Sequence, residues 1–144
     1  MIEDQLIINK EYAPLFKKLV QNTKNNISGF LFHDSFHSTA NGSVIDNLIY
    51  ELRLAQNRGI DIKIYCHSQK QIERLRKYNF RLKLSKGYKT MHSKAWCFDN
   101  QYLLVGSHNF TENANSVNLE MSYLTTNKNA IIKYINYFNT IWSL

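Results

Sequence analysis

The sequence is short of the residues that build linkers and unstructured tails. It has one proline and five glycines among 144 residues, and it contains no internal repeat. Hydrophobic residues make up 44% of the chain and aromatic residues 13%, which excludes an intrinsically disordered or fibrous protein. We therefore expect residues 1–144 to form a single compact domain.

Cysteine is also scarce, and no long apolar run is present. Cys66 and Cys97 lie far apart in apolar, strand-like stretches and outside any zinc-binding pattern, so both are expected to be buried thiols. The amino terminus carries Glu3 and Asp4 where a signal or transit peptide would be basic. No segment approaches the roughly 20 apolar residues of a membrane span. These features predict a cytoplasmic protein without a membrane span.

Acidic residues are outnumbered by basic ones. Eighteen Lys and Arg against eleven Asp and Glu give a net charge of +7 and an isoelectric point near 9.4. The whole surplus lies in residues 70–89, which hold one acidic residue and the basic residues Lys70, Arg74, Arg76, Lys77, Arg81, Lys83, Lys86 and Lys89. Such a run is compatible with an ordinary solvated face. Because it leads directly to His92, it also predicts a path for a nucleic-acid backbone, with Arg74, Arg76 and Lys77 as substrate contacts.

Hydrophobic periodicity predicts an α/β fold. Residues 27–32 and 60–65 are expected to be strands, and the helix between them begins at a Ser43 cap and ends at Gly59. The other expected elements are helices around Pro14, over 69–78 and after Asn127, and strands over 80–84, 90–98, 102–107 and 117–125. We therefore predict a mixed, largely parallel β-sheet flanked by helices on both faces.

Five polar side chains in the second half of the chain are expected to converge. Strand periodicity places His92 and Lys94 on one face, and the next strand ends near Ser107 and Asn109. Glu120 lies on a third strand, from which its carboxylate could hold an imidazole N–H and fix the tautomer. A histidine, a lysine, an amide and a hydroxyl without a carboxylate cluster suit an anionic phosphate group rather than a metal ion.

The spacing of these residues resembles the phospholipase D superfamily. His92, Lys94 and Asp99 match its HKD motif, His-x-Lys-x4-Asp, and the stretch from Gly106 to Asn109 matches the Gly-Ser/Gly-x-Asn that follows. A His-x-Lys-x4-Asp pattern alone is a weak signal, but the second stretch makes coincidence far less expected. The resemblance implies the phospholipase D/nuclease fold, with one HKD motif in a single catalytic domain and Asp99 in a mainly structural role.

The resemblance extends beyond the motif. Residues 54–64 are similar to the family's Ala-x-x-Arg-Gly-Val-x-Val-x-Ile passage from a helix into a strand, so the resemblance covers residues 27–126. The stretches 109–111 and 118–120 are similar to the Asn-Phe/Trp-Thr and Asn-x-Glu stretches of short single-motif nucleases. The family resemblance therefore favours a nuclease.

The resemblance also implies a role for each candidate residue. His92 would be the nucleophile that attacks phosphorus and forms a phosphohistidine intermediate. Lys94 and Asn109 would bind the non-bridging oxygens, Ser107 would support the phosphate pocket, and Glu120 would orient His92. Such a reaction requires no metal ion and no cofactor.

The single motif has a consequence for assembly. Family members with two motifs bring two histidines to one site, where one attacks and the other protonates the leaving group. With one copy per chain, we expect a two-fold homodimer in which the two copies of His92 meet at the interface. The two imidazoles are then expected to titrate as a coupled pair.

Four other histidines are present besides His92. His33 and His37 are four residues apart, which is compatible with metal binding, but nothing nearby completes a ligand set. His37 is instead a candidate substrate contact. His108 occupies the variable position of Gly-Ser-x-Asn and is interpreted as a bystander, and His67 has no assigned role.

The leading hypothesis is a metal-independent phosphodiesterase, most specifically an endonuclease that cleaves DNA or RNA. The first alternative is a phospholipase D or transphosphatidylase acting on lipid phosphodiesters, since the same pocket serves both substrates. The second is a nucleic-acid-binding module that does not cleave. The complete set of His92, Lys94, Asn109 and Glu120 argues against this module, because a binding protein needs no nucleophile.

Overall fold

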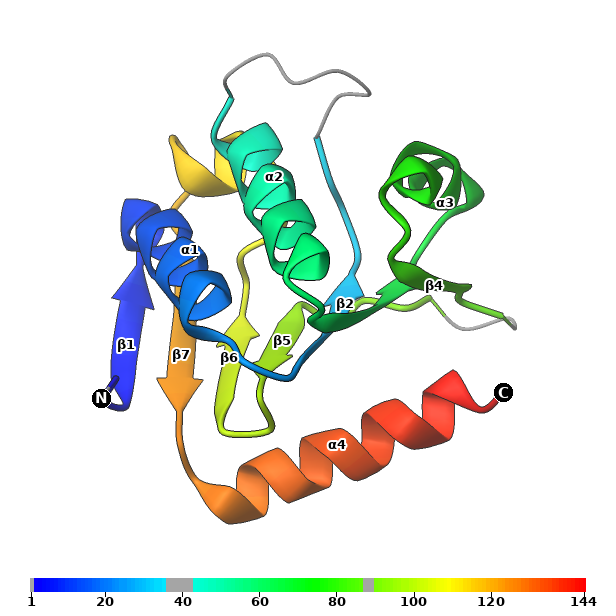
Figure 1. Cartoon of the computed structure of the whole chain (residues 1–144). Helices are drawn as coiled ribbons and strands as arrows, with labels where there is room; N and C mark the ends of the chain where they lie inside the picture. Colours follow the sequence, from blue (N-terminus) through cyan, green and yellow to red (C-terminus); the bar gives the residue numbers. More distant parts are fainter. Residues whose placement is uncertain (1, 36–42, 87–89) are drawn as a thin grey trace.

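The protein is built around one mixed β-sheet. The computed structural model, shown in Figure 1, describes residues 2–35, 43–86 and 90–144. Seven strands of this part form the sheet in the order β1-β7-β6-β5-β2-β3-β4. The strands are β1 (Gln5–Ile8), β2 (Asn26–Leu31), β3 (Asp61–Cys66), β4 (Arg81–Leu84), β5 (Ala95–Phe98), β6 (Tyr102–Gly106) and β7 (Met121–Thr125). The predicted α/β class with a mixed sheet is confirmed.

The sheet is less parallel than predicted. β2, β3 and β4 pair in parallel, whereas the pairs β2–β5, β5–β6, β6–β7 and β7–β1 are antiparallel. A parallel pair needs a long crossover, which α2 and α3 supply in the first half. In the second half, Phe98 of β5 pairs with Tyr102 of β6 across a three-residue turn, in which Asp99 and Asn100 both have φ of +54°.

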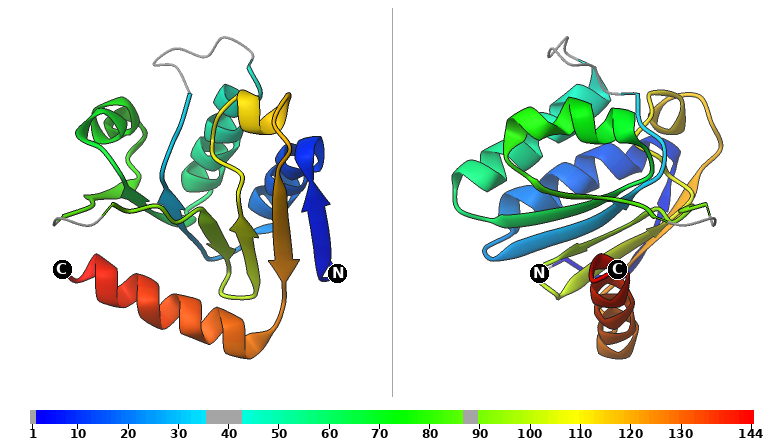
Figure 2. Two further views of the ribbon diagram at one scale, coloured as in Figure 1. Left: turned by 180° about the vertical axis from the view of Figure 1, so that it is seen from behind. Right: turned by 90° about the vertical axis from the view of Figure 1, so that its right-hand side faces the viewer.

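Helices cover both faces of the sheet, as predicted. α1 (Tyr12–Asn22), α2 (Val44–Asn57) and α3 (Gln69–Leu75) lie on one side, and α4 (Lys128–Trp142) lies on the other (Figure 2). Two apolar cores result, one centred on Phe16 and Trp96 beneath α1 and α2, the other on Phe30 and Phe138 beneath α4.

The predicted cysteine environment is also confirmed. Cys66 and Cys97 are both buried and unbridged. Burial raises the pKa of each thiol to about 12, which keeps both in the neutral form.

The predicted helix ends are found in the structure. The Ser43 hydroxyl accepts the N–H of Asp46 at 3.1 Å, and α2 is followed by Gly59 with φ of +93°, a conformation that favours glycine. The Asn127 side chain caps α4 by accepting the N–H of Ala130 at 2.9 Å. None of the helices in the described ranges is long and apolar enough to cross a membrane.

Three elements differ from the prediction. β1 was not predicted, because four residues carry too little pattern to identify a strand, and it forms by pairing with β7. The strand predicted over 90–98 begins at Ala95, and the strand predicted over 117–125 begins at Met121. Of the residues that the structure describes, 90–94 form no ladder with β2, and the chain after β2 pairs with Phe110 instead.

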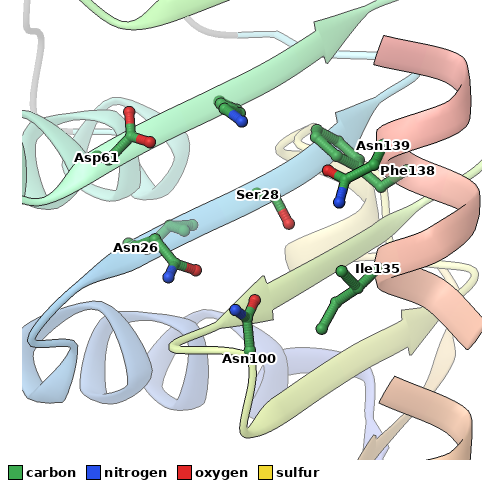
Figure 3. Close-up of a pocket in the computed structure, with 9 residues that line it drawn as sticks. Asn26, Ser28, Asp61, Asn100, Ile135, Phe138 and Asn139 are labelled. Carbon is green, nitrogen blue, oxygen red and sulfur yellow. The ribbon is translucent and has the colours of Figure 1, made fainter. Parts of the chain in front are cut away.

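The strand directions define two opposite edges of the sheet. The carboxyl ends of β1, β2, β3 and β6 lie at the same edge as the amino ends of β5 and β7, and we call this the upper edge, as it lies in Figure 1. The lower edge holds a polar pocket of about 210 Å³ where Asn26, Ser28, Asn100 and Asn139 converge (Figure 3). The HKD histidine and lysine lie at the upper edge, away from this pocket.

Candidate active site

His92 and Lys94 meet at the upper edge, immediately before β5. Lys94 Nζ lies 3.3 Å from Nδ1 and 3.4 Å from Nε2 of His92, and it donates to the His92 carbonyl at 3.0 Å. Desolvation lowers the pKa of Lys94, and the nearby Glu120 carboxylate opposes this shift. The pair adjoins as predicted, although the residues lie before the strand and not within it.

Phe32 forms an apolar floor under this pair. Its ring centroid lies 4.5 Å from that of His92, and Lys94 Nζ lies 4.8 Å from the ring centroid. His33 and His67 flank the same ring at 3.9 and 4.8 Å between centroids. The ring therefore limits the positions that the imidazole and the ammonium group can occupy. Sequence reasoning missed Phe32, because an apolar residue at a strand end carries no functional signal.

Ser107 and Glu120 face each other across the ends of β6 and β7. The Ser107 hydroxyl donates to Oε2 of Glu120 and accepts the N–H of Met121 at 3.0 Å. Asn118 Nδ2 donates to Oε1 of the same carboxylate at 3.1 Å. Among the described residues, the hydrogen bonds to the Glu120 carboxylate come from Ser107 and Asn118, and the expected bond from His92 is not among them. The register of the ladder contributes, because Gly106 pairs with Ser122 and Ser107 then lies opposite Met121, the residue next to Glu120.

Asn109 is fixed through its neighbours in the chain. Phe110 donates its N–H to the His33 carbonyl at 3.1 Å, and Ser35 donates to the Phe110 carbonyl at 2.7 Å. These bonds tie the Asn109 turn to the chain that continues from β2. Asn109 Oδ1 is buried and has no hydrogen-bond partner among the residues that the structure describes. The amide therefore has unused hydrogen-bonding capacity close to the upper edge.

Two further motif residues have structural explanations. A Cβ atom on Gly106 would lie 2.3 Å from Ser122 Cα, so the close approach of β6 and β7 requires glycine. The Asp99 carboxylate accepts the backbone N–H groups of Lys24, Asn25 and Asn26 at 2.7 to 3.1 Å. Asp99 therefore holds the lower edge of the sheet together, far from His92.

The residues predicted to contact substrate do not all lie free on the surface. Arg74 donates to the Asp34 carboxylate at 2.7 Å, and the Asp34 side chain is only 2% exposed. The Arg74 guanidinium therefore compensates a buried charge, and because its side chain is still 34% exposed, its contact with substrate stays a prediction. Arg76 and Lys77 are exposed. His37 lies outside the described residues.

We expect Arg74→Ala to destabilise the protein by about 3 kcal/mol, because it leaves the Asp34 carboxylate buried without its cation. Urea unfolding followed by circular dichroism measures this loss. The double variant Arg74→Ala/Asp34→Asn removes the charge as well and is expected to recover part of the stability. Equal stabilities of Arg74→Ala and the wild-type protein would contradict the interpretation.

His92, Lys94 and Ser107 line a cavity of about 530 Å³ on the face that α4 covers. Tyr134 and Tyr137 of α4 form its opposite wall. The described residues hold no group of three or more His, Cys, Asp or Glu placed to bind a metal ion. The arrangement offers an imidazole, a cation and hydroxyl groups around an open space, which fits an anionic ligand.

His108, which was interpreted as a bystander to the chemistry, takes part in the packing and hydrogen bonding of the fold. Its side chain is buried, with 2% exposure, and its ring stacks on Tyr12 at 4.4 Å between centroids. Nε2 lies 2.8 Å from the Asn9 carbonyl, which can only accept, so Nε2 carries the proton. Nδ1 then accepts from the Ser122 hydroxyl at 2.7 Å. A variable motif position gave no signal that could have identified this contact.

Protonation of His108 is expected to weaken the fold. Burial lowers the pKa of His108 below its ordinary 6.5, although the Asn9 hydrogen bond and Glu120 oppose this. The unfolded chain therefore binds the proton more readily, and the stability from neutral His108 is lost as the pH falls through about 6.5 toward the folded pKa. Thermal melts should show a steeper decline between about pH 7 and 5 for wild type than for His108→Gln. Parallel declines would contradict this.

Solved structures share the fold over almost the whole chain. NucT from Helicobacter pylori has a TM-score of 0.82 at 19% identity, and the aligned region covers 98% of this chain and 96% of the NucT chain. Nuc from Salmonella typhimurium, a phospholipase D family member, has a TM-score of 0.76 at 18% identity, with coverages of 98% and 95%. Phosphatidylserine synthase from Haemophilus influenzae has a TM-score of 0.71 at 12% identity, with coverages of 95% and 36%. At these identities the similarity establishes the fold, and the predicted phospholipase D/nuclease fold is confirmed.

A comparison with curated protein sequences gave no match. Residues 32–142, by contrast, match the family described as "Cardiolipin synthase, PLD-like domain". This range contains the whole HKD motif and the Gly-Ser-x-Asn stretch that follows it. Because the matched family spans most of the chain and the fold agrees with it, this protein belongs to the phospholipase D-like family.

Proposed function

We propose that the protein is a metal-independent phosphodiesterase that cleaves DNA or RNA. The observation that carries the proposal is the pairing of His92 with Lys94, a nucleophile beside a fixed cation, at 3.3 Å between Nδ1 and Nζ. The pair lies at the sheet edge that also carries Ser107 and Glu120, and membership of the phospholipase D-like family supports the same chemistry.

The reaction proceeds in two steps. A ring nitrogen of neutral His92 attacks phosphorus, the bond from phosphorus to the leaving oxygen breaks, and that oxygen takes a proton from a general acid. Water then attacks phosphorus of the phosphohistidine and breaks its bond to His92. The group that acted as general acid in the first step now acts as general base and takes the proton of the water. Lys94 and the Asn109 amide stabilise the charge on the non-bridging oxygens in both steps.

The general acid is the partner subunit's His92 in a homodimer. An apolar surface next to the site supports this arrangement. We call it the β1–β7–β6 face, formed by Leu6, Ile8, Val105, Met121 and Tyr123, which are 36–56% exposed. Leu6 pairs with Tyr123, Ile8 with Met121, and Tyr123 with Val105, so these side chains form one patch.

The β1–β7–β6 face is continuous with the candidate site. Val105 is two residues from Ser107, and Met121 follows Glu120 directly. An isologous contact through this face would cover the patch and bring the two copies of the site together. The dimer thus explains both an exposed apolar surface and a site that holds one HKD histidine per chain.

Lipid phosphodiester chemistry is the second candidate. The description of the matched family names cardiolipin synthase, and one structure of similar fold is a phosphatidylserine synthase. The excess of basic residues in residues 70–89 favours a nucleic acid, because a polyanionic backbone gains from each cation along its path.

One experiment tests the activity and its substrate. The protein is incubated in EDTA with single- and double-stranded DNA, RNA and phospholipid vesicles, beside the His92→Ala variant. EDTA-resistant cleavage of a nucleic acid is expected. Cleavage that disappears in EDTA would overturn the metal-independent mechanism, and cleavage of lipid alone would favour the second candidate.

Arg76 and Lys77 are expected to contribute to nucleic-acid binding. The double variant Arg76→Glu/Lys77→Glu should weaken binding and reduce the slope of log affinity against log salt by about two, roughly one per lost phosphate contact. Fluorescence anisotropy at several salt concentrations measures the slope. Lys10→Glu/Lys18→Glu is the matched control, since both residues are exposed and lie outside residues 70–89. An unchanged slope in Arg76→Glu/Lys77→Glu would refute the binding path.

A further inference from the structure

We propose that Asn9 and His108 are positioning residues that hold Glu120 in place for the reaction. The proposal rests on the proposed function and adds a role for Glu120, whose charge acts on Lys94, the cation of the proposed mechanism. Asn9 is the first residue of the short 3-10 helix η1 (Asn9–Glu11), which directly follows β1. It is 111 positions away from Glu120 in the chain.

Asn9 and Glu120 exchange two hydrogen bonds. The Asn9 N–H donates to the Glu120 carbonyl at 3.1 Å, and the Glu120 N–H donates to Asn9 Oδ1 at 2.7 Å. The Asn9 backbone has φ of +50°, a left-handed conformation that asparagine adopts more readily than most residues. Both backbone polar groups of Glu120 are therefore held by one residue that is suited to this conformation.

His108 holds Asn9 from the core side. Its Nε2–H donates to the Asn9 carbonyl, while Ser122 and Tyr12 fix the ring in a buried position. His108 also lies between Ser107 and Asn109. The turn that carries these two candidate site residues therefore also carries the residue that supports Glu120 through Asn9. The contacts form a closed path from His108 through Asn9 and Glu120 to Ser107.

This path controls where the Glu120 carboxylate lies. The carboxylate accepts from Ser107 and Asn118, and its charge acts on Lys94. If the Glu120 backbone moves, the carboxylate moves relative to all of these groups. Displacement of a catalytic group by about 1 Å can reduce the rate by about 100-fold. Asn9 therefore acts on the reaction without touching the substrate.

The test uses three substitutions, two at Asn9 and one at Glu120. Asn9→Gly keeps the left-handed backbone and the N–H donor but removes the Oδ1 acceptor, and it is expected to lower kcat at least about tenfold with KM changed less than about twofold. Asn9→Asp restores an acceptor and should recover most of kcat. In a Glu120→Gln background, Asn9→Gly should have no further effect on kcat, because Asn9 acts through the carboxylate.

Other results would overturn the proposal. Equal losses of kcat from Asn9→Gly in the wild-type and Glu120→Gln backgrounds would show a general structural role. An increase in KM with kcat unchanged would also overturn the proposal.

A second measurement separates this proposal from the proposed function. If the wild-type protein cleaves no phosphodiester, the proposed function fails, but amide hydrogen exchange still tests the hold on Glu120. Exchange of the Glu120 amide should be at least about tenfold faster in Asn9→Gly, with the Leu124 amide of β7 unchanged. An unchanged rate at Glu120 would overturn the proposal whatever the activity.

Discussion

His92→Ala is expected to reduce phosphodiester cleavage at least about 1,000-fold, because the variant has no group that can form the covalent intermediate. The residual rate would reflect charge stabilisation by Lys94 and Asn109 alone. The loss should appear in kcat, with substrate affinity nearly retained, since the imidazole contributes little to binding the backbone. Single-turnover cleavage of a labelled oligonucleotide measures the effect.

Two controls accompany this variant. His92 is exposed, so the substitution should leave the free energy of unfolding within about 0.5 kcal/mol of wild type. Gln101→Ala, an exposed change at the lower edge of the sheet, should leave cleavage unchanged. If His92→Ala cleaves at the wild-type rate while it remains folded, the nucleophile is a different residue.

Placing a negative charge on the β1–β7–β6 face should produce a monomer and lower cleavage at least about 100-fold. Tyr123→Glu is the most direct variant, because Tyr123 pairs with both Leu6 and Val105 at the centre of the patch. Two glutamates facing each other across a two-fold axis repel and lose solvation when they are buried. The site would then lack the partner subunit's His92 as its general acid. Light scattering together with cleavage assays measures both effects.

Tyr50→Glu is the matched control for this variant. Tyr50 is 49% exposed, close to the 45% of Tyr123, and it lies on α2 on the opposite side of the sheet. It should change neither the oligomeric state nor the activity. A fully active Tyr123→Glu monomer would show that one subunit is sufficient for the reaction.

Mixed dimers test independently whether each site uses the His92 of both subunits. Wild-type and His92→Ala subunits are mixed in equal amounts and allowed to exchange. If the reaction needs both copies of His92, activity per total protein should fall to about one quarter of wild type, since about a quarter of the dimers are fully wild type. If each subunit works alone, activity should fall to about one half.

Much of the fold could be read from local patterns. The Ser43 and Asn127 caps, the Gly59 helix end and the strand-helix-strand passage from β2 to β3 follow from residues close together in the chain. The number of parallel strand pairs was overestimated. The pattern of a strand does not show whether its neighbour in the sheet is reached through a hairpin or through a crossover. β1 was missed because a four-residue strand depends on its partner, here β7.

The candidate site divides in the same way. The pairing of His92 with Lys94 follows from their separation by one residue, and it was expected. The partners of Glu120 were not, because they depend on which strand ends lie side by side. The same holds for Arg74, because its ion pair with the buried carboxylate of Asp34 joins residues 40 positions apart.

The sequence by itself determined the family of this protein and the candidate reactive groups, since the HKD spacing and the basic segment are read directly from the chain. The tertiary structure decided which groups meet at the upper edge. The physical reason is that hydrogen bonds such as the one from Glu120 to Asn9 join residues 111 positions apart. Such bonds depend on the strand order β1-β7-β6-β5-β2, which no local pattern specifies.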